Sequence, residues 1–154
     1  MPDQTFTIVR ARAADARFAR QAIVELHARE PFDEAALADF LTDPTCYLFL
    51  ALEGDRVVGS LNGYSLRHPN RREPAFLLYE IDVRPECWNR GIGKALVARF
   101  TAEARAAGAF EVWVVTNQSN ARAMAMYTRC GLSRENDDDV MLALTFSDGR
   151  SKPA

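Results

Sequence analysis

The sequence predicts a single α/β domain with a mixed central sheet flanked by helices, and three observations support this fold class. Apolar positions switch repeatedly between a period of 2 and a period of 3.6, so strands and helices alternate along the chain. The length of 154 residues suits one domain with one core. Apolar residues make up 48% of the chain and charged residues 26%, which is typical of globular proteins and argues against a coiled coil, collagen or disorder.

The expected order of elements is β-α-α-β-β-β-α-β-α-β, and the first five are separated by clear local signals. Apolar side chains recur at helical spacing before Pro31, which ends the first helix, and acidic side chains open the second. Gly54-Asp55 indicates a tight hairpin between two strands. The expected elements are a strand at 6–10, helices at 14–29 and 33–41, and strands at 45–53 and 56–66.

In the second half, glycines and polar loops separate the expected elements. The segment 68–74 contains two prolines and is expected to be a polar loop before an apolar central strand. Gly108 closes one helix, whereas Asn120 and Gly131 suit the N-cap and C′ positions of another. The expected elements are strands at 76–83, 110–116 and 140–146, and helices at 94–107 and 120–130. The domain is expected to span 1–147, with a polar tail at 148–154.

Charge and cysteine content narrow the function classes. The chain has nineteen Lys and Arg and twenty-one Asp and Glu, which gives a formal net charge of −2. This balance argues against nucleic-acid binding, which usually requires an excess of basic residues. No apolar run is long enough to span a membrane, and the first residues lack the pattern of a secretory signal. Cys46, Cys87 and Cys130 are widely spaced and do not form metal-ligand pairs. We therefore expect a cytoplasmic, soluble domain without a metal.

The most informative segment is Tyr79–Leu96, YEIDVRPECWNRGIGKAL, in which a strand leads through a glycine-rich turn into a helix. Glycine lets the backbone approach a ligand closely, and the free N–H groups of a helix start favour an anion. Arg90 and Lys94 add positive charge, so the turn can hold a pyrophosphate. The dinucleotide-binding and P-loop spacings are both absent, and a glycine at a helix start is by itself more often a simple turn device.

A second segment, Asn117–Leu132, places Asn120 and Tyr127 two helical turns apart on one face. Taken singly, Asn120 is best interpreted as an N-cap and Tyr127 as a core residue. Their combination with the glycine-rich turn changes this interpretation.

Together the two segments resemble the motifs of the GCN5-related N-acetyltransferases. The family's first motif, Arg/Gln-x-x-Gly-x-Gly/Ala, fits in two registers, one starting at Arg90 and one placing Trp88 where Arg or Gln usually stands. The second, Asn-x-x-Ala-x-x-Leu/Met-Tyr-x-x-x-Gly-Phe, corresponds to Asn120, Ala123, Met126-Tyr127, Gly131 and Leu132. The resemblance implies the fold of that family over nearly the whole chain, with acetyl-CoA as cosubstrate. The implied cofactor-binding residues are Ile81, Val83, Trp88, Asn89, Arg90, Gly91, Ile92, Gly93, Lys94, Ala95, Asn120, Ala123 and Tyr127.

From Phe32 to Leu132 the chain is further similar to the short gentamicin-type aminoglycoside 3-N-acetyltransferases. Those enzymes carry Tyr-Asp where this chain has Tyr79-Glu80, and their carboxylate is thought to act as general base. The resemblance therefore implies acetylation of a primary amine on a small polycationic acceptor, such as an aminoglycoside, in a setting of antibiotic resistance.

Amine acetylation needs a group that removes a proton, and the sequence offers two candidates. Glu80 lies in an otherwise apolar strand just before the glycine-rich turn, and its alternative interpretation is a solvated or ion-paired glutamate. His27, at a helix end, is a possible helper or a surface histidine that favours the helix dipole. By resemblance, Tyr127 would protonate the leaving thiolate, and the backbone N–H of Val83 would polarise the acetyl carbonyl.

Acidic side chains are candidates for binding a cationic acceptor. One acidic segment, residues 135–139, has four acids among five residues, and such a run more often forms a solvated turn. The candidate acceptor-binding residues are Asp33, Glu34, Tyr79, Asp137, Asp138 and Asp139. Two alternatives stay open: acetylation of a protein N-terminus or lysine, with the polar loop at 68–74 and its arginines, together with Arg67, facing the peptide, and a non-catalytic acyl-CoA-binding module. The resemblance also implies a homodimer, which is common in that family.

Overall fold

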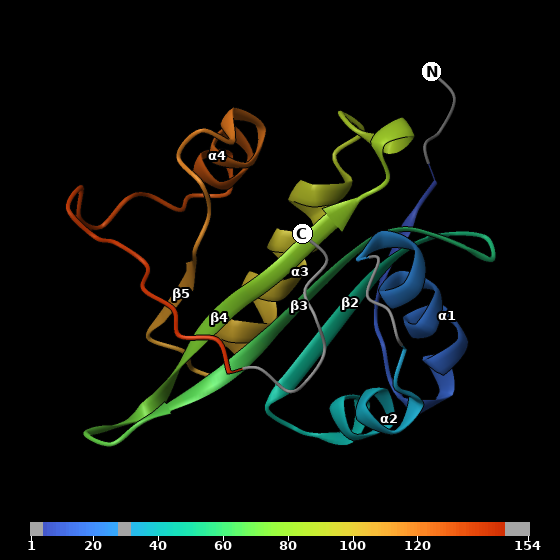
Figure 1. Ribbon diagram of the computed structural model, residues 1–154, viewed down its shortest axis with the longest axis horizontal. Coiled ribbons are helices and arrows are strands. Elements are labelled where there is room, and N and C mark those ends of the chain that lie inside the picture. The colour runs from blue at the N-terminus through green and yellow to red at the C-terminus, as the bar shows by residue number, and fades with distance from the viewer. Residues whose placement is uncertain (1–4, 28–31, 147–154) are drawn as a thin grey trace.

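The computed structural model describes residues 5–27 and 32–146, and in these ranges the chain forms a five-stranded mixed sheet with helices on both faces (Figure 1). The strands are ordered β1-β2-β3-β4-β5; β1 to β4 are antiparallel, and β5 is parallel to β4. The expected mixed sheet is confirmed. The strands are β1 (Thr7–Arg10), β2 (Cys46–Glu53), β3 (Arg56–His68), β4 (Arg71–Val83) and β5 (Glu111–Val114). The helical elements are η1 (Ala13–Asp15), α1 (Ala16–Gln21), η2 (Ala22–Leu26), α2 (Glu34–Thr42), η3 (Pro85–Cys87), α3 (Ile92–Ala106) and α4 (Ala121–Arg129).

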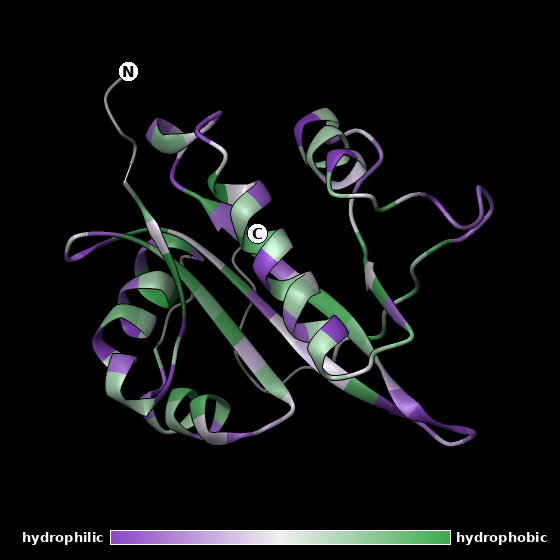
Figure 2. Ribbon diagram, turned by 180° about the vertical axis from the view of Figure 1, so that it is seen from behind, coloured by the Kyte–Doolittle hydropathy of each residue, from purple (hydrophilic) through white to green (hydrophobic). Residues whose placement is uncertain are grey.

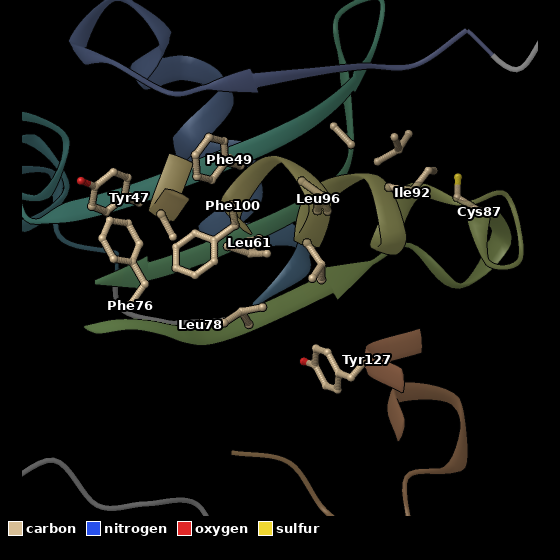
Figure 3. Close-up of a cluster of buried hydrophobic side chains, with 14 residues drawn as sticks. Tyr47, Phe49, Leu61, Phe76, Leu78, Cys87, Ile92, Leu96, Phe100 and Tyr127 are labelled. Atoms are coloured by element: carbon tan, nitrogen blue, oxygen red, sulfur yellow. The ribbon is translucent and has the colours of Figure 1, made fainter. Parts of the chain in front are cut away.

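Two apolar clusters hold the layers together, one on each face of the sheet. The larger lies between the sheet and α3, where Phe49, Phe76 and Phe100 are fully buried (Figure 3). The smaller joins β2 and β3 to α1 and α2 through side chains such as Leu50 and Val57. Hydrophobic residues run along the central strands, whereas the tip of the β3–β4 hairpin is hydrophilic (Figure 2).

Close packing of α3 on the sheet depends on a glycine. A Cβ at Gly63 would lie 2.5 Å from the carbonyl oxygen of Leu77 and 2.6 Å from the Phe100 ring. No side chain fits there, so Gly63 allows Phe100 to fill the centre of the core.

Three elements differ from the sequence prediction. The helix expected at 14–29 is divided into the 3-10 turn η1, the helix α1 and the π-helical η2, and residues 28 and 29 lie outside the described ranges. The prediction of a loop at 68–74 is wrong, because β3 and β4 continue through this segment as a hairpin in which His68 pairs with Arg71. Cross-strand hydrogen bonds thus override the two prolines, which lie at the hairpin turn and at Pro74.

The strand expected at 140–146 is also wrong. These residues form no ladder, and their large apolar side chains are exposed, from 72% for Met141 to 88% for Leu142. An apolar run makes a strand only where a neighbouring strand edge accepts its backbone hydrogen bonds, and this segment pairs with none in the described chain. The expected tail at 148–154 lies outside the described residues. No described helix is long and apolar enough to cross a membrane.

Candidate active site

The candidate site is a cleft that opens where β4 and β5 separate. The two strands pair from Ala75 opposite Glu111 to Leu78 opposite Val114, after which β4 continues and β5 ends. The cleft has a volume of about 230 Å³. Its lining residues are Tyr79, Glu80, Ile81, Asp82, Val114, Val115, Thr116, Asn120, Ala123 and Tyr127.

A β-bulge in β4 sets which side chains face which layer. Asn62 pairs with Glu80 and Gly63 with Leu78, so Tyr79 is an extra residue on β4. Leu78 and Ile81 both belong to the core against α3. The ring of Tyr79 instead contacts Tyr64 on the α2 side, at 5.6 Å between centroids.

As a result, Tyr79, Glu80 and Asp82 share the face that α1 and α2 cover. The two carboxylates meet the buried side chain of His27, which follows η2. His27 Nδ1 lies 2.6 Å from Asp82 Oδ2 and 3.7 Å from Glu80 Oε2. The other ring nitrogen, Nε2, lies 2.8 Å from Ser60 Oγ, which is also fully buried. The structure therefore brings His27 and Glu80 together, as candidates for one site.

Two contacts anchor this end of the helical layer to the sheet, and a third lies within the layer itself. Gln21 Oε1 accepts a hydrogen bond of 2.6 Å from the backbone N–H of Val57, and Arg84 forms an ion pair with Glu25. The π-helical turn continues the chain so that the backbone N–H of His27 donates to the Ala22 carbonyl. A π turn holds an extra residue and so changes the direction of the side chains that follow, an arrangement frequent at functional sites.

Tyr127 reaches the cleft from the opposite side, on α4 (Figure 3). Its side chain is buried, at 6% exposure, and this burial, with contributions from Cys130 and Asp82, raises the pKa of Tyr127 to about 12. The hydroxyl is thus protonated at neutral pH and can donate a hydrogen bond into the cleft.

The glycine-rich turn has the backbone geometry expected of an anion-binding helix start. Asn89 and Gly91 have positive φ angles of 62° and 81°, and Gly91 is the N-cap of α3. The first helical hydrogen bond runs from Ala95 N–H to the Gly91 carbonyl. The amides of Ile92, Gly93 and Lys94 precede it and have no partner within the helix. A Cβ at Gly93 would lie 2.7 Å from Met126 Sδ, so this glycine lets α4 lie close to the turn.

The charged and aromatic residues of the turn are arranged differently from the expectation. Arg90 forms an ion pair with Glu53 on β2, so its charge is directed to the sheet and not to the turn's outer face. Lys94 is exposed. The Trp88 indole donates to the Val83 carbonyl at 2.9 Å, and Arg122 lies 3.3 Å above its ring.

Asn120 is the N-cap of α4, and its side chain accepts a hydrogen bond from Ala123 N–H at 3.1 Å. Both residues also line the cleft. Asn120 therefore acts as the N-cap that the sequence predicted and also lines the cleft.

The candidate acceptor-binding acids do not converge. Asp33 is the N-cap of α2 and accepts from Ala36 N–H, and the exposed Glu34 begins the same helix. Asp137, Asp138 and Asp139 are exposed in a loop that extends from the sheet beyond β5, on the side away from α2 (Figure 1). Tyr79, by contrast, lines the cleft and is 58% exposed.

Sequence reasoning missed Asp82 and Ser60. The available signal for Asp82 was its spacing of two residues from Glu80, which places both on one face of a strand. No sequence signal points to Ser60, because the sequence does not show which distant residue a buried serine in an apolar strand contacts. Among the described residues, no group of three or more His, Cys, Asp or Glu is arranged to hold a metal ion.

Curated relatives match part of this chain. A mycothiol acetyltransferase of Geodermatophilus obscurus is 30% identical over 98 residues, 62% of this chain and 31% of the relative. An uncharacterized N-acetyltransferase of Mycobacterium bovis is 32% identical over 97 residues, 63% of this chain and 59% of the relative. The matched region therefore spans less than two thirds of either relative.

Solved structures share the fold across nearly the whole chain. An aminoglycoside acetyltransferase from an uncultured soil metagenomic sample, in complex with sisomicin, has a TM-score of 0.81 at 22% identity and covers 96% of this chain and 100% of its own. The enzyme AAC(6')-Iy, in complex with a bisubstrate analogue, has a TM-score of 0.76 at 21% identity, covering 94% and 100%. A ribosomal-protein-alanine N-acetyltransferase from Brucella melitensis biovar Abortus 2308 has a TM-score of 0.71 at 16% identity, covering 91% and 100%.

The family model of the acetyltransferase (GNAT) family matches residues 12–132, which include β2 to β5, both candidate motifs and the whole cleft. With this match and the shared fold, the chain belongs to the acetyltransferase (GNAT) family.

Proposed function

We propose that this protein transfers the acetyl group of acetyl-CoA directly to a primary amine of a small polycationic acceptor, with an aminoglycoside as the acceptor class. The observation that carries the proposal is the cleft itself: Glu80 on β4 and Tyr127 on α4 line it together, and Met126, next to Tyr127, lies against Gly93 in the first turn of α3. A proton acceptor, a proton donor and an anion-binding turn are thus combined in one place.

Glu80 is the proposed general base. An amine attacks a thioester only as the free base, so the ammonium must first lose a proton to a nearby group, directly or through water. The carboxylate of Glu80 lies in the cleft wall with its side chain 25% exposed. It can therefore contact both an acceptor and a bridging water molecule.

Tyr127 is the proposed general acid. As the carbon–sulfur bond breaks, negative charge develops on the thiolate of CoA, and a positioned O–H can donate to it. A tyrosine with a pKa of about 12 keeps its proton until that charge develops. The backbone N–H of Val83, where β4 ends, is the proposed donor to the acetyl carbonyl oxygen.

The start of α3 is the proposed pyrophosphate site. The first-turn amides and the positive end of the helix dipole favour a bound anion, and the left-handed conformation of Gly91 exposes these amides. Lys94 adds an exposed positive charge. Because Arg90 is paired with Glu53, we assign it to holding the turn against β2.

The acceptor class rests on charge and on resemblance. Glu80 and Asp82 make one wall of the cleft anionic, which favours ammonium groups. The similarity of Phe32–Leu132 to gentamicin-type enzymes favours the 3-amino group as the position acetylated. A peptide acceptor is the second candidate, favoured by the shared fold of the ribosomal-protein-alanine N-acetyltransferase.

Thiol release from acetyl-CoA, followed by mass spectrometry of the product, tests this function. Sisomicin, gentamicin, linear polyamines and peptides with a free N-terminus or a lysine form the panel. We expect an acetylated aminoglycoside that carries one added acetyl group. Acetylation of peptides alone would overturn the acceptor class, whereas no turnover with any amine would overturn the acetyltransferase assignment of this site.

A further inference from the structure

The proposed reaction assigns no role to His27, whose side chain forms a network with Asp82 and Ser60. The imidazole is 2% exposed and lies between Ser60, which is fully buried, and Asp82, which is 48% exposed in the cleft wall. A buried polar ring that uses both nitrogens in this way connects the interior of the sheet to the cleft.

The donors in this network follow from the chemistry of the groups. An ionised carboxylate can only accept, so Nδ1 carries the proton in the 2.6 Å contact with Asp82. A serine hydroxyl can donate to Nε2 of a neutral imidazole or accept from an imidazolium. The ring therefore keeps both hydrogen bonds in either protonation state, and its orientation does not change.

We propose that Asp82 is a second acceptor-binding carboxylate of this site, and that His27, held by Ser60, is the positioning residue that orients it. The proposal rests on the proposed function and deepens it. It assigns to the site an acceptor with a second ammonium group close to the amine that is acetylated.

Geometry supports two cationic groups side by side. Glu80 and Asp82 lie two residues apart on one strand face, and both reach the same nitrogen of His27. Two neighbouring carboxylates repel each other unless cations lie between them. The imidazole supplies one hydrogen-bond donor from the buried side, and an acceptor with two ammonium groups can place a positive charge beside each carboxylate from the cleft.

Asp82 also lies near Tyr127, since both residues line the cleft. Besides burial and Cys130, the charge of Asp82 contributes to the raised pKa of Tyr127. An ammonium bound to Asp82 is therefore held between the residues proposed as base and acid, where it fixes the orientation of the acceptor.

The kinetic test compares an acceptor that has two adjacent amines with a monoamine acceptor of similar size. For Asp82→Asn we expect KM for the diamine to rise about tenfold or more, the loss of a hydrogen bond to a charged group, with little change in kcat. KM for the monoamine should stay unchanged. Equal effects on both acceptors would overturn the assignment of Asp82.

Two isosteric substitutions test the positioning role of His27. The amide nitrogen of Asn can replace Nδ1 and donate to Asp82, whereas that of Gln can replace Nε2 and reach only Ser60. We expect KM for the diamine to be lower in His27→Asn than in His27→Gln, and His27→Gln to match Asp82→Asn. Ser60→Ala should give an intermediate KM. If both His27 variants fold and have the same KM, the positioning role is refuted.

An independent readout does not require turnover. The chain has two histidines, so comparison with His68→Gln assigns the signals of His27 in two-bond 1H–15N spectra. We expect Nδ1 of His27 to be protonated in the wild type and to lose this preference in Asp82→Asn. A proton on Nε2 alone would overturn the network, even if the wild type acetylates no amine and the proposed function fails separately.

Discussion

His27 Nδ1 lies 3.7 Å from Glu80 Oε2, which places the proposed base next to a buried imidazole and not in bulk solvent. The contact joins a residue after η2 to the C-terminal part of β4, across the layer between helices and sheet. Glu80 and Asp82 share this face because they lie two residues apart on β4, and the bulge at Tyr79 lets Leu78 and Ile81 both face the core.

The first prediction concerns this base. Glu80→Gln keeps the shape of the side chain but cannot accept a proton from the acceptor, so the rate of acetyl transfer should fall about 10²–10⁴-fold. Affinity for CoA, measured by calorimetry, should not change. Glu73→Gln, an exposed position on the same strand, is the matched control and should retain full activity. An unchanged rate for Glu80→Gln at every pH would exclude Glu80 as the base and leave His27→Ala to be tested.

The second prediction concerns the start of α3. Gly91 and Gly54 both have positive φ angles, 81° and 56°, and an added Cβ meets no atom within 4 Å at either. Valine at either position should therefore destabilise the fold by a similar amount, about 1–2 kcal/mol. Only Gly91→Val should weaken CoA binding, because it distorts the amides of the proposed pyrophosphate site. Thermal shifts with added CoA measure this difference, and an equal shift for both variants would refute the site.

The third prediction concerns Tyr127. Tyr127→Phe removes the proposed donor to the thiolate, and turnover should fall while the affinity for CoA stays near that of the wild type. Because the pKa is about 12, turnover of the wild type should show no decline from ionisation of this hydroxyl below pH 11. Steady-state rates between pH 6 and pH 11 give both results.

The same pKa predicts how stability depends on pH. In the unfolded chain Tyr127 would ionise near its ordinary pKa of 10, whereas the folded protein keeps the proton until about pH 12. The folded state thus binds more protons between these values, and stability falls as pH rises through this window. The loss of unfolding free energy approaches about 2.7 kcal/mol above pH 12, because the pKa difference between 10 and about 12 is worth about 1.36 kcal/mol per pKa unit. Denaturant unfolding at pH 9 and pH 11 should show a smaller loss for Tyr127→Phe.

The sequence predicted those parts of the fold and site that local patterns determine. The helix expected at 94–107 is present as α3 (Ile92–Ala106), beginning two residues earlier than predicted, and Asn120 is the N-cap of α4, as expected. The sequence did not predict features that depend on contacts between residues far apart in the chain. Nothing local shows that Arg90 pairs with Glu53, or that residues 140–146 find no partner strand in the described chain.

The last prediction concerns the acidic loop at residues 137–139, whose side chains are exposed beyond β5. If these carboxylates attract a polycationic acceptor, they act through space, and salt weakens this attraction because the Debye length is only about 8 Å at physiological ionic strength. Changing Asp137, Asp138 and Asp139 together to Asn should then raise KM for an aminoglycoside at low salt more than it lowers kcat, since such charges stabilise the ground state and the transition state alike. The difference in KM between the triple variant and the wild type should shrink as salt is added. Asp55→Asn, at the exposed β2–β3 turn, controls for the general effect of removing a carboxylate. A KM that depends equally on salt in the wild type and the triple variant would show that the loop does not attract the acceptor, and would leave Glu80 and Asp82 in the cleft wall as the charges that select it.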